Sequence, residues 1–138
     1  MKNNKGFTLV ELLAVIVILA MLITIAVPST IAISNKLKLN MYCKKIDSIE
    51  VSAKLYGEDR KESFTESYIT ADGTYTSRKI TIKDLIDSGD LKKDNTSSPY
   101  VIDPRDDSSM DEVELTVYEK YNRIYVAFDD TIKTTCDK

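Results

Sequence analysis

The sequence predicts an α+β fold in which one long N-terminal helix packs on a small antiparallel β-sheet. The helix is predicted because the chain from Phe7 to Tyr56 contains no glycine and one proline, and its apolar residues run first continuously and then along one face. The sheet is predicted because two short runs near the C-terminus alternate apolar and polar residues. Strands that follow a helix, rather than alternating with helices, favour an α+β domain.

Length and composition limit the functions that this chain can have. Its 138 residues leave room for one small domain. It carries 19 basic and 22 acidic residues, which does not indicate nucleic-acid binding because phosphate recognition needs clustered Lys and Arg. It has no histidine, which removes the commonest general base and the usual activation of a Ser or Cys nucleophile. We therefore expect no enzyme activity, no catalytic residues and no cofactor.

The apolar run covers residues 7–27 and contains a single charge, Glu11. As a helix it would be about 31 Å long, which matches the hydrocarbon core of a membrane. A cleaved secretory signal has a shorter apolar region and ends in small residues, unlike residues 26–29 here. The run therefore predicts a membrane-spanning anchor.

Glu11 needs an explanation, because a carboxylate inside a membrane span is costly. One interpretation is local: near the N-terminus of a helix, the carboxylate benefits from the helix dipole and can reach the membrane interface. The other is functional: a cation from another molecule, or from elsewhere in the chain, neutralises the charge. The hydroxyl of Thr8 is expected to bond back into the helix.

Residues 5–11, Lys-Gly-Phe-Thr-Leu-Val-Glu, follow a short polar leader and open the apolar run. This junction resembles the processing site of type IV prepilins, and the resemblance extends through the apolar run to Pro28. It implies that a prepilin peptidase cuts between Gly6 and Phe7, and that the new N-terminal Phe7 is N-methylated. It also implies that Glu11 pairs with the N-terminal amine of a neighbouring subunit, or of its own chain, and sets the register of a filament.

Together these observations divide the chain into four parts. Pro28 lacks an N–H and clashes with the turn before it, so we expect a kink or a weak point in the helix there. The expected parts are a leader peptide at 1–6, a transmembrane and polymerisation helix at 7–28, an amphipathic helix at 29–56, and a globular α+β domain at 57–138.

The amphipathic part of the helix carries one apolar stripe, with steps of three and four residues, that should bury against the domain. Gly57 is followed by charged residues and predicts the end of the helix. The stripe consists of Leu39, Tyr42, Cys43, Ile46, Ile49, Ala53 and Tyr56.

The rest of the chain predicts short elements separated by turn residues. Asp72-Gly73 predicts a tight turn between two strands. Thr81 with Asp84 resembles the capping box of a short helix that Gly89 ends. The expected elements are a hairpin at 67–76, a helix at 80–89, a strand at 100–102, and two antiparallel strands at 112–118 and 123–128. They predict a sheet of three or four strands packed on the helix stripe, an architecture that pilins share.

The two cysteines of this chain, Cys43 and Cys136, indicate one disulfide if the domain is exported. The bond would close a loop of about 93 residues and tie the C-terminus to the long helix. The alternative is that Cys43 is a small core residue and Cys136 a free thiol. Many pilins place both cysteines in the C-terminal part, and this sequence departs from that arrangement.

Acidic residues crowd a stretch between the predicted short helix and the last two strands. Carboxylate oxygens suit calcium, but the D-x-D-x-D-G pattern of a calcium-binding loop is missing from the sequence. We therefore expect a solvated acidic loop and no metal site. The acids are Asp103, Asp106, Asp107, Asp111 and Glu112.

The resemblance implies a structural subunit of a type IV pilus, which waits in the cytoplasmic membrane and polymerises into an extracellular filament for adhesion, surface motility and biofilm formation. The implied partners are other pilin subunits, the prepilin peptidase, and the assembly platform with its motor ATPase. Residues 81–93, followed by Ile102-Asp103-Pro104, also resemble pilin-like proteins of Gram-positive bacteria. The alternatives are a pseudopilin of a DNA-uptake or type II secretion system, and a singly anchored extracytoplasmic binding domain, which an uncut leader would support.

Overall fold

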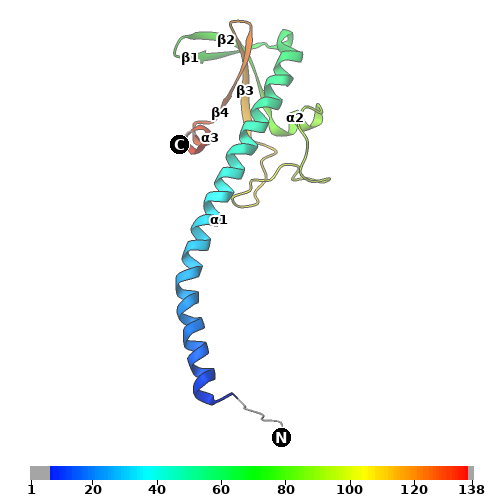
Figure 1. Cartoon of the computed structure of the whole chain (residues 1–138). Helices are drawn as coiled ribbons and strands as arrows, with labels where there is room; N and C mark the ends of the chain where they lie inside the picture. The colour runs from blue at the N-terminus through cyan, green and yellow to red at the C-terminus, as the bar shows by residue number, and fades with distance from the viewer. Residues whose placement is uncertain (1–6, 137–138) are drawn as a thin grey trace. The chain divides into compact units, whose positions relative to one another are not determined.

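The computed structural model describes residues 7–136, including the side chains of all but residues 25–29. The chain forms two compact units, Met1–Leu37 and Lys38–Lys138. Helix α1 (Leu9–Arg60) belongs to both, and the other described helices and strands belong to the second unit (Figure 1). The fold class is α+β, as the sequence predicts.

In the second unit, the apolar stripe of α1 forms one side of the core, as predicted. Its partners include Ile82 and Leu85 from a short helix, and Leu115 and Val117 from the sheet. Full burial of a side chain such as that of Ile49 contributes about 1.5–3 kcal/mol to folding. The buried residues of the stripe are Tyr42, Ile46, Ile49, Ala53 and Tyr56, and its half-buried residues are Leu39 and Cys43.

Four strands form one antiparallel sheet in the order β1-β2-β3-β4. The two strands predicted near the C-terminus pair with each other, with Val117 opposite Val126. Tyr121 and Asn122 connect them with φ angles of 51° and 60°, the left-handed conformations that a two-residue type I′ turn requires. The strands are β1 (Glu66–Thr70), β2 (Gly73–Thr81), β3 (Glu114–Lys120) and β4 (Arg123–Phe128).

The predicted N-terminal hairpin is formed by β1 and β2, but its turn is shifted by one residue. Thr70 pairs with Gly73, so Ala71 and Asp72 occupy the turn, and Gly73 opens β2 instead of sharing the turn centre. The Asp72 carboxylate accepts hydrogen bonds from the Thr70 hydroxyl and from Lys120 Nζ on β3. These bonds fix Asp72 at the turn and link the hairpin to the next strand.

The hydrogen bonds of Asp72 predict that the thermal stability of the second unit depends on pH. The hydrogen bonds from Lys120 and Thr70 lower the pKa of Asp72 to about 2. A carboxyl group whose pKa is lowered by folding stabilises the fold above its unfolded pKa, and loses that contribution as the pH falls towards the folded value. We therefore expect Asp72→Asn to have a slightly lower Tm than the wild-type chain at pH 6, and the gap to shrink as the pH falls from 4 towards 2. Thermal unfolding across this range measures the gap, and a gap independent of pH would contradict the assignment.

Helix α1 does not end at Gly57, where the sequence predicts its end, but continues to Arg60 and is followed by a 3-10 helix, Lys61–Ser63. Gly57 is buried. A Cβ atom at Gly57 would lie 2.6 Å from Val117 Cγ1 and 2.7 Å from Ile124 Cγ2. The missing side chain therefore lets the helix approach the sheet closely, which is a different use of glycine from a helix stop.

Helix α2 (Ile82–Asp87) confirms the predicted capping box. The Asp84 N–H donates to Thr81 Oγ1 at 3.2 Å, and the Thr81 N–H donates to the Asp84 carboxylate at 2.8 Å. The helix is shorter than the predicted range of 80–89. Ile80 lies opposite Leu115 in the sheet, so β2 extends up to the cap residue before the helix begins.

The prediction of a strand at residues 100–102 was wrong. In the described chain this segment belongs to the loop between α2 and β3, and Ile102 makes an isolated bridge there. The N–H groups of Tyr100 and Val101 donate to the Asp111 carboxylate at 2.9 and 2.8 Å. A side chain thus takes the hydrogen bonds that a neighbouring strand would otherwise accept.

Helix α3 (Asp130–Cys136), which follows β4, was not expected from the sequence. Its first turn is capped by Asp129, whose carboxylate accepts hydrogen bonds from the N–H and the hydroxyl of Thr131 at 2.8 and 2.6 Å. An Asp directly before a helix is a common N-cap, so the sequence contained a local signal for this start. The three threonines of this segment have low helix propensity, so no helix was predicted here.

Candidate functional site

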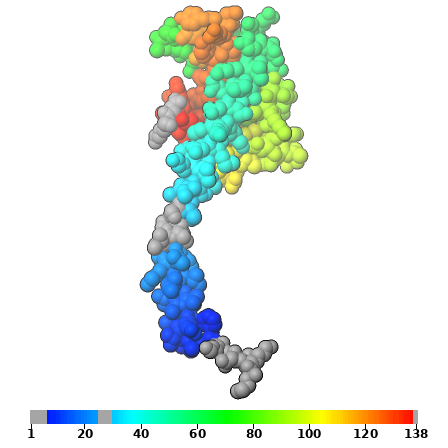
Figure 2. Space-filling model, in the orientation of Figure 1, coloured from blue at the N-terminus to red at the C-terminus, as the bar shows by residue number. Residues whose placement is uncertain are grey.

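The first turns of α1 present apolar side chains on every side. Every residue from 7 to 24 is exposed, with Phe7 at 77% and Leu9 at 82%. We call this region the apolar helix surface, and Figure 2 shows it in blue. A helix that is apolar all round is stable only when other apolar groups surround it. Its large apolar residues are Phe7, Leu9, Val10, Leu12, Leu13, Val15, Ile16, Val17, Ile18, Leu19, Met21, Leu22 and Ile23.

The apolar helix surface begins with a capping box made by Thr8 and Glu11. The N–H and the hydroxyl of Thr8 each donate to Glu11 Oε2 at 2.9 Å, and the Glu11 N–H donates to Thr8 Oγ1 at 3.3 Å. Two backbone donors that a helix N-terminus leaves unpaired are thereby satisfied. Within a single chain, Glu11 is therefore stabilised locally at the N-terminus of its own helix.

This role of Thr8 was not predicted, since its hydroxyl was expected to bond back into the helix. The signal was present, since Thr-x-x-Glu at residues 8–11 is the pattern of a capping box before an apolar run. The two roles of Glu11 are compatible in chemical terms, because a carboxylate offers about four acceptor positions.

The capping box leaves Glu11 able to take a further partner. Both hydrogen bonds from Thr8 go to Oε2. Among the hydrogen bonds of the described residues, Oε1 accepts none, and the residue is exposed. The arrangement therefore holds a carboxylate on an apolar surface, with one oxygen that accepts no hydrogen bond from the described residues.

For two other predicted residues of this region the structure gives little or no description. Gly6, on the predicted cleavage side of Phe7, precedes the described residues. Pro28 lies in α1 among residues whose side chains are not described, so the kink expected there stays a prediction. Measured over the described residues, no helix combines the length and the apolar character that crossing a membrane requires.

The acidic loop between α2 and β3 was predicted to be solvated, but it is not solvated throughout, because Asp103 and Asp111 are buried. Asp103 is 5% exposed, and its carboxylate accepts hydrogen bonds from Nε and Nη2 of Arg105 at 3.0 and 2.6 Å. The Arg105 guanidinium lies over the ring of Tyr42 on α1, with 3.6 Å between Cζ and the ring centroid. Within the described residues, no group of three or more acidic or cysteine side chains is placed to hold a metal ion.

The Asp111 carboxylate accepts three hydrogen bonds from other residues of this loop. It is 4% exposed, and it accepts from the N–H groups of Tyr100 and Val101 and from the hydroxyl of Ser98 at 3.3 Å. A buried carboxylate that accepts several hydrogen bonds stabilises the segment that donates them.

We expect Asp111→Asn to lower the free energy of unfolding by about 1–3 kcal/mol. The amide keeps the shape of the side chain, but one of its two positions becomes a donor that faces a backbone N–H. Urea denaturation monitored by circular dichroism measures the change. Asp107→Asn is the matched control, because Asp107 is exposed with φ of 62°, a conformation that asparagine also adopts. Equal stability of the two variants would contradict the role of Asp111.

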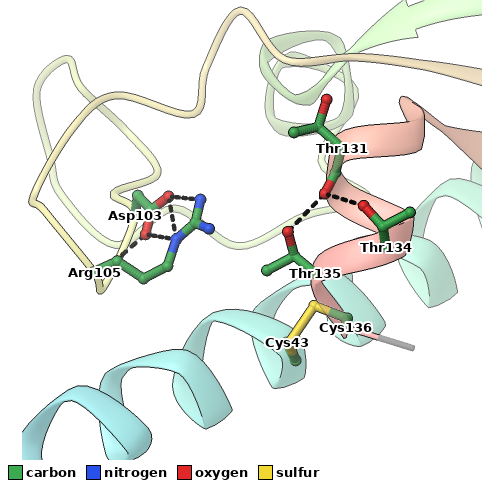
Figure 3. The surroundings of a disulfide bond; sticks show 7 residues. All are labelled: Cys43, Asp103, Arg105, Thr131, Thr134, Thr135 and Cys136. Atoms are coloured by element: carbon green, nitrogen blue, oxygen red, sulfur yellow. Dashed lines mark hydrogen bonds and ion pairs between the residues drawn. A yellow bond between two sulfur atoms is a disulfide. The ribbon is translucent and has the colours of Figure 1, made fainter. Parts of the chain in front are cut away.

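Cys43 on α1 and Cys136 on α3 are joined by a disulfide in the structure, with their Cα atoms 5.4 Å apart. Figure 3 shows the two side chains meeting between the helices. This is the pairing that the sequence predicts. Closing a loop of 93 residues stabilises a fold by roughly 4–5 kcal/mol in the loop-entropy model.

We expect the purified full-length chain to show no free thiol. The measurement is titration with a thiol reagent under denaturing, non-reducing conditions. The same sample after reduction should show both thiols and serves as the positive control. Two titratable thiols before reduction would exclude the disulfide in the purified protein.

Residues 1–27 match the family model described as the prokaryotic N-terminal methylation motif. No curated protein and no solved structure matches the chain. The matched residues include the capping box and the whole apolar helix surface.

Proposed function

We propose, from the type IV prepilin-like signature that this chain carries in residues 1–27, that it is a structural subunit which polymerises through its N-terminal helix into a type IV pilus. The observation that carries the proposal is the combination of this motif with a helix whose side chains are exposed and apolar on every side. Packing of such helices against each other keeps their apolar surface out of water once the subunits have left the membrane. Proteins with this motif act as structural subunits, so the proposed role needs no catalytic residue.

Processing comes first in this proposal. A prepilin peptidase cuts between Gly6 and Phe7, and the new amine of Phe7 is N-methylated. The cut leaves a positive amine close to Glu11 in sequence. The Oε1 atom of Glu11, which accepts no hydrogen bond from the described residues, pairs with the amine of a neighbouring subunit. In a low dielectric such a charge pair selects one register between helices, because an unpaired charge there is heavily penalised.

The proposed route places the subunit in the cytoplasmic membrane before assembly and in an extracellular filament afterwards. The support for the membrane stage is the apolar run at residues 7–27 together with the motif. The proposed partners are other pilin subunits, the assembly platform and its motor ATPase. Adhesion, surface motility and biofilm formation are the proposed roles of the filament.

The decisive experiment is mass spectrometry of the mature N-terminus, carried out on fibres sheared from cells that express the chain. We expect the first residue to be N-methylated Phe7 and the chain to be a component of the fibres. Cells that lack the prepilin peptidase are the control and should retain residues 1–6. A protein that keeps these residues in wild-type cells and never enters a polymer would exclude the proposal and favour a singly anchored binding domain.

The same motif also fits a pseudopilin of a DNA-uptake or type II secretion system. Deletion of the gene separates the two functions. Loss of surface fibres supports the pilus subunit. Loss of transformation or secretion, with surface fibres intact, supports the pseudopilin.

A further inference from the structure

The sequence of helix α3 gives it a low intrinsic tendency to form a helix. It has seven residues, none of them buried, and isolated helices of this length do not persist in water. Thr131, Thr134 and Thr135 are β-branched and have low helix propensity. The hydroxyls of Thr134 and Thr135 are bonded within the helix, to the carbonyls of Asp130 and Thr131 at 2.8 and 2.6 Å. The position of α3 must therefore depend on what attaches it to the rest of the second unit.

Its attachments are few. At the N-terminal end the cap by Asp129 is local, and in the middle Ile132 is partly buried against the core. No ion pair among the described residues involves Asp130 or Lys133 of α3. At the C-terminal end the disulfide joins the helix covalently to α1 (Figure 3). The disulfide is therefore the strongest restraint on this helix.

Helix α3 forms one wall of a groove of about 500 Å³ in the second unit. Ile132 and Cys136 line it from α3, Ile46 lines it from α1, and Val126 and Phe128 line it from β4. Val126 and Phe128 are partly buried where they pack against the core. These apolar residues share the lining with charged residues, among them Asp47, Glu50 and Lys133. If α3 moved away, the apolar part of the lining would lose part of its cover.

We propose that the Cys43–Cys136 pair is a redox latch that holds α3 in place as a wall of this groove. In the oxidised chain α3 is docked, and in the reduced chain α3 unfolds and uncovers the apolar lining. Closing the latch removes two protons and two electrons from the two thiols and forms one S–S bond. A partner disulfide accepts the electrons by thiol–disulfide exchange and becomes a pair of thiols. Opening the latch is the reverse exchange, in which a dithiol partner reduces the Cys43–Cys136 bond to two thiols and is itself oxidised to a disulfide. The class of partner is therefore a protein or small molecule that carries an exchangeable dithiol–disulfide pair.

The test is hydrogen exchange measured by mass spectrometry on the full-length chain in detergent, with and without dithiothreitol. We expect reduction to speed exchange in residues 130–136 about 100-fold more than in β3, because local opening of α3 does not require the sheet to open. Re-oxidation with glutathione disulfide should restore the protection of α3. The double variant Cys43→Ser/Cys136→Ser should behave as the reduced chain does without any reagent.

Two results would overturn the latch. Unchanged protection of α3 after reduction would mean that packing of Ile132 alone holds the helix. A parallel loss of protection in α3 and β3 would mean that the disulfide stabilises the whole unit and controls no separate element. Because reduction is applied to the folded wild-type chain, a double variant that fails to fold does not prevent the measurement from deciding.

Discussion

Glu11→Gln is expected to leave the subunit stable but to reduce its incorporation into filaments by two orders of magnitude or more. Glutamine keeps an acceptor oxygen for the hydrogen bonds from Thr8, so the helix N-terminus stays capped. It removes the negative charge with which, in our proposal, the amine of a neighbouring Phe7 pairs. Leaving one partner of a buried ion pair unmatched costs about 3–5 kcal/mol. A cost of this size corresponds to the expected fall in filament incorporation of two orders of magnitude or more.

The matched control is Thr8→Ala, which makes the opposite change. It removes the hydroxyl from the capping box and keeps the Glu11 carboxylate. We expect this variant to assemble, with a cost of about 1 kcal/mol for the lost cap. Quantitative blotting of sheared fibres against total protein measures both variants. Normal fibres from Glu11→Gln, or equal loss from Thr8→Ala, would show that the charge of Glu11 does not set the register.

Gly57→Ala is expected to lower the free energy of unfolding by about 1–3 kcal/mol. In an exposed helix the same change would raise the free energy of unfolding by up to about 1 kcal/mol. The sign of the change therefore shows whether Gly57 is an ordinary helix residue or permits close approach of the helix to the sheet. The added methyl group would lie 2.6 Å from Val117 Cγ1 and 2.7 Å from Ile124 Cγ2. Both atoms are on stiff, β-branched side chains that are buried, so neither can move aside cheaply.

A double-mutant cycle with Val117→Ala tests the contact itself. Removing the two γ-methyl groups of Val117 makes room for the new methyl, so Gly57→Ala should cost less in that background, with a coupling of at least about 0.5 kcal/mol. Leu55→Ala, at a residue of the same helix that is 58% exposed, serves as the control for substitution in α1. Urea denaturation of the four members of the cycle gives the coupling. A stabilising Gly57→Ala would contradict the close approach.

The candidate site was predicted in part. The motif at residues 5–11 and the apolar run after it were visible in the sequence, and they direct attention to Glu11. The capping box that Glu11 makes with Thr8 was missed, although its pattern is equally local. The sequence could not show that both Thr8 donors share one carboxylate oxygen of Glu11, because this depends on the side-chain geometry.

The sequence by itself determined the elements whose signals are short-range. The apolar stripe of α1, the alternation in β3 and β4, and the capping box of α2 each depend on residues within a few positions of each other. Tertiary structure decided the rest. Gly57 lies inside the helix because the sheet packs against it, and α3 is held where Cys136 is bonded to Cys43. Residues 100–102 form no strand because the carboxylates of Asp111 and Asp94 accept their N–H hydrogen bonds. In each case the partner lies at least eight residues away in the chain, and no local sequence pattern records such a contact.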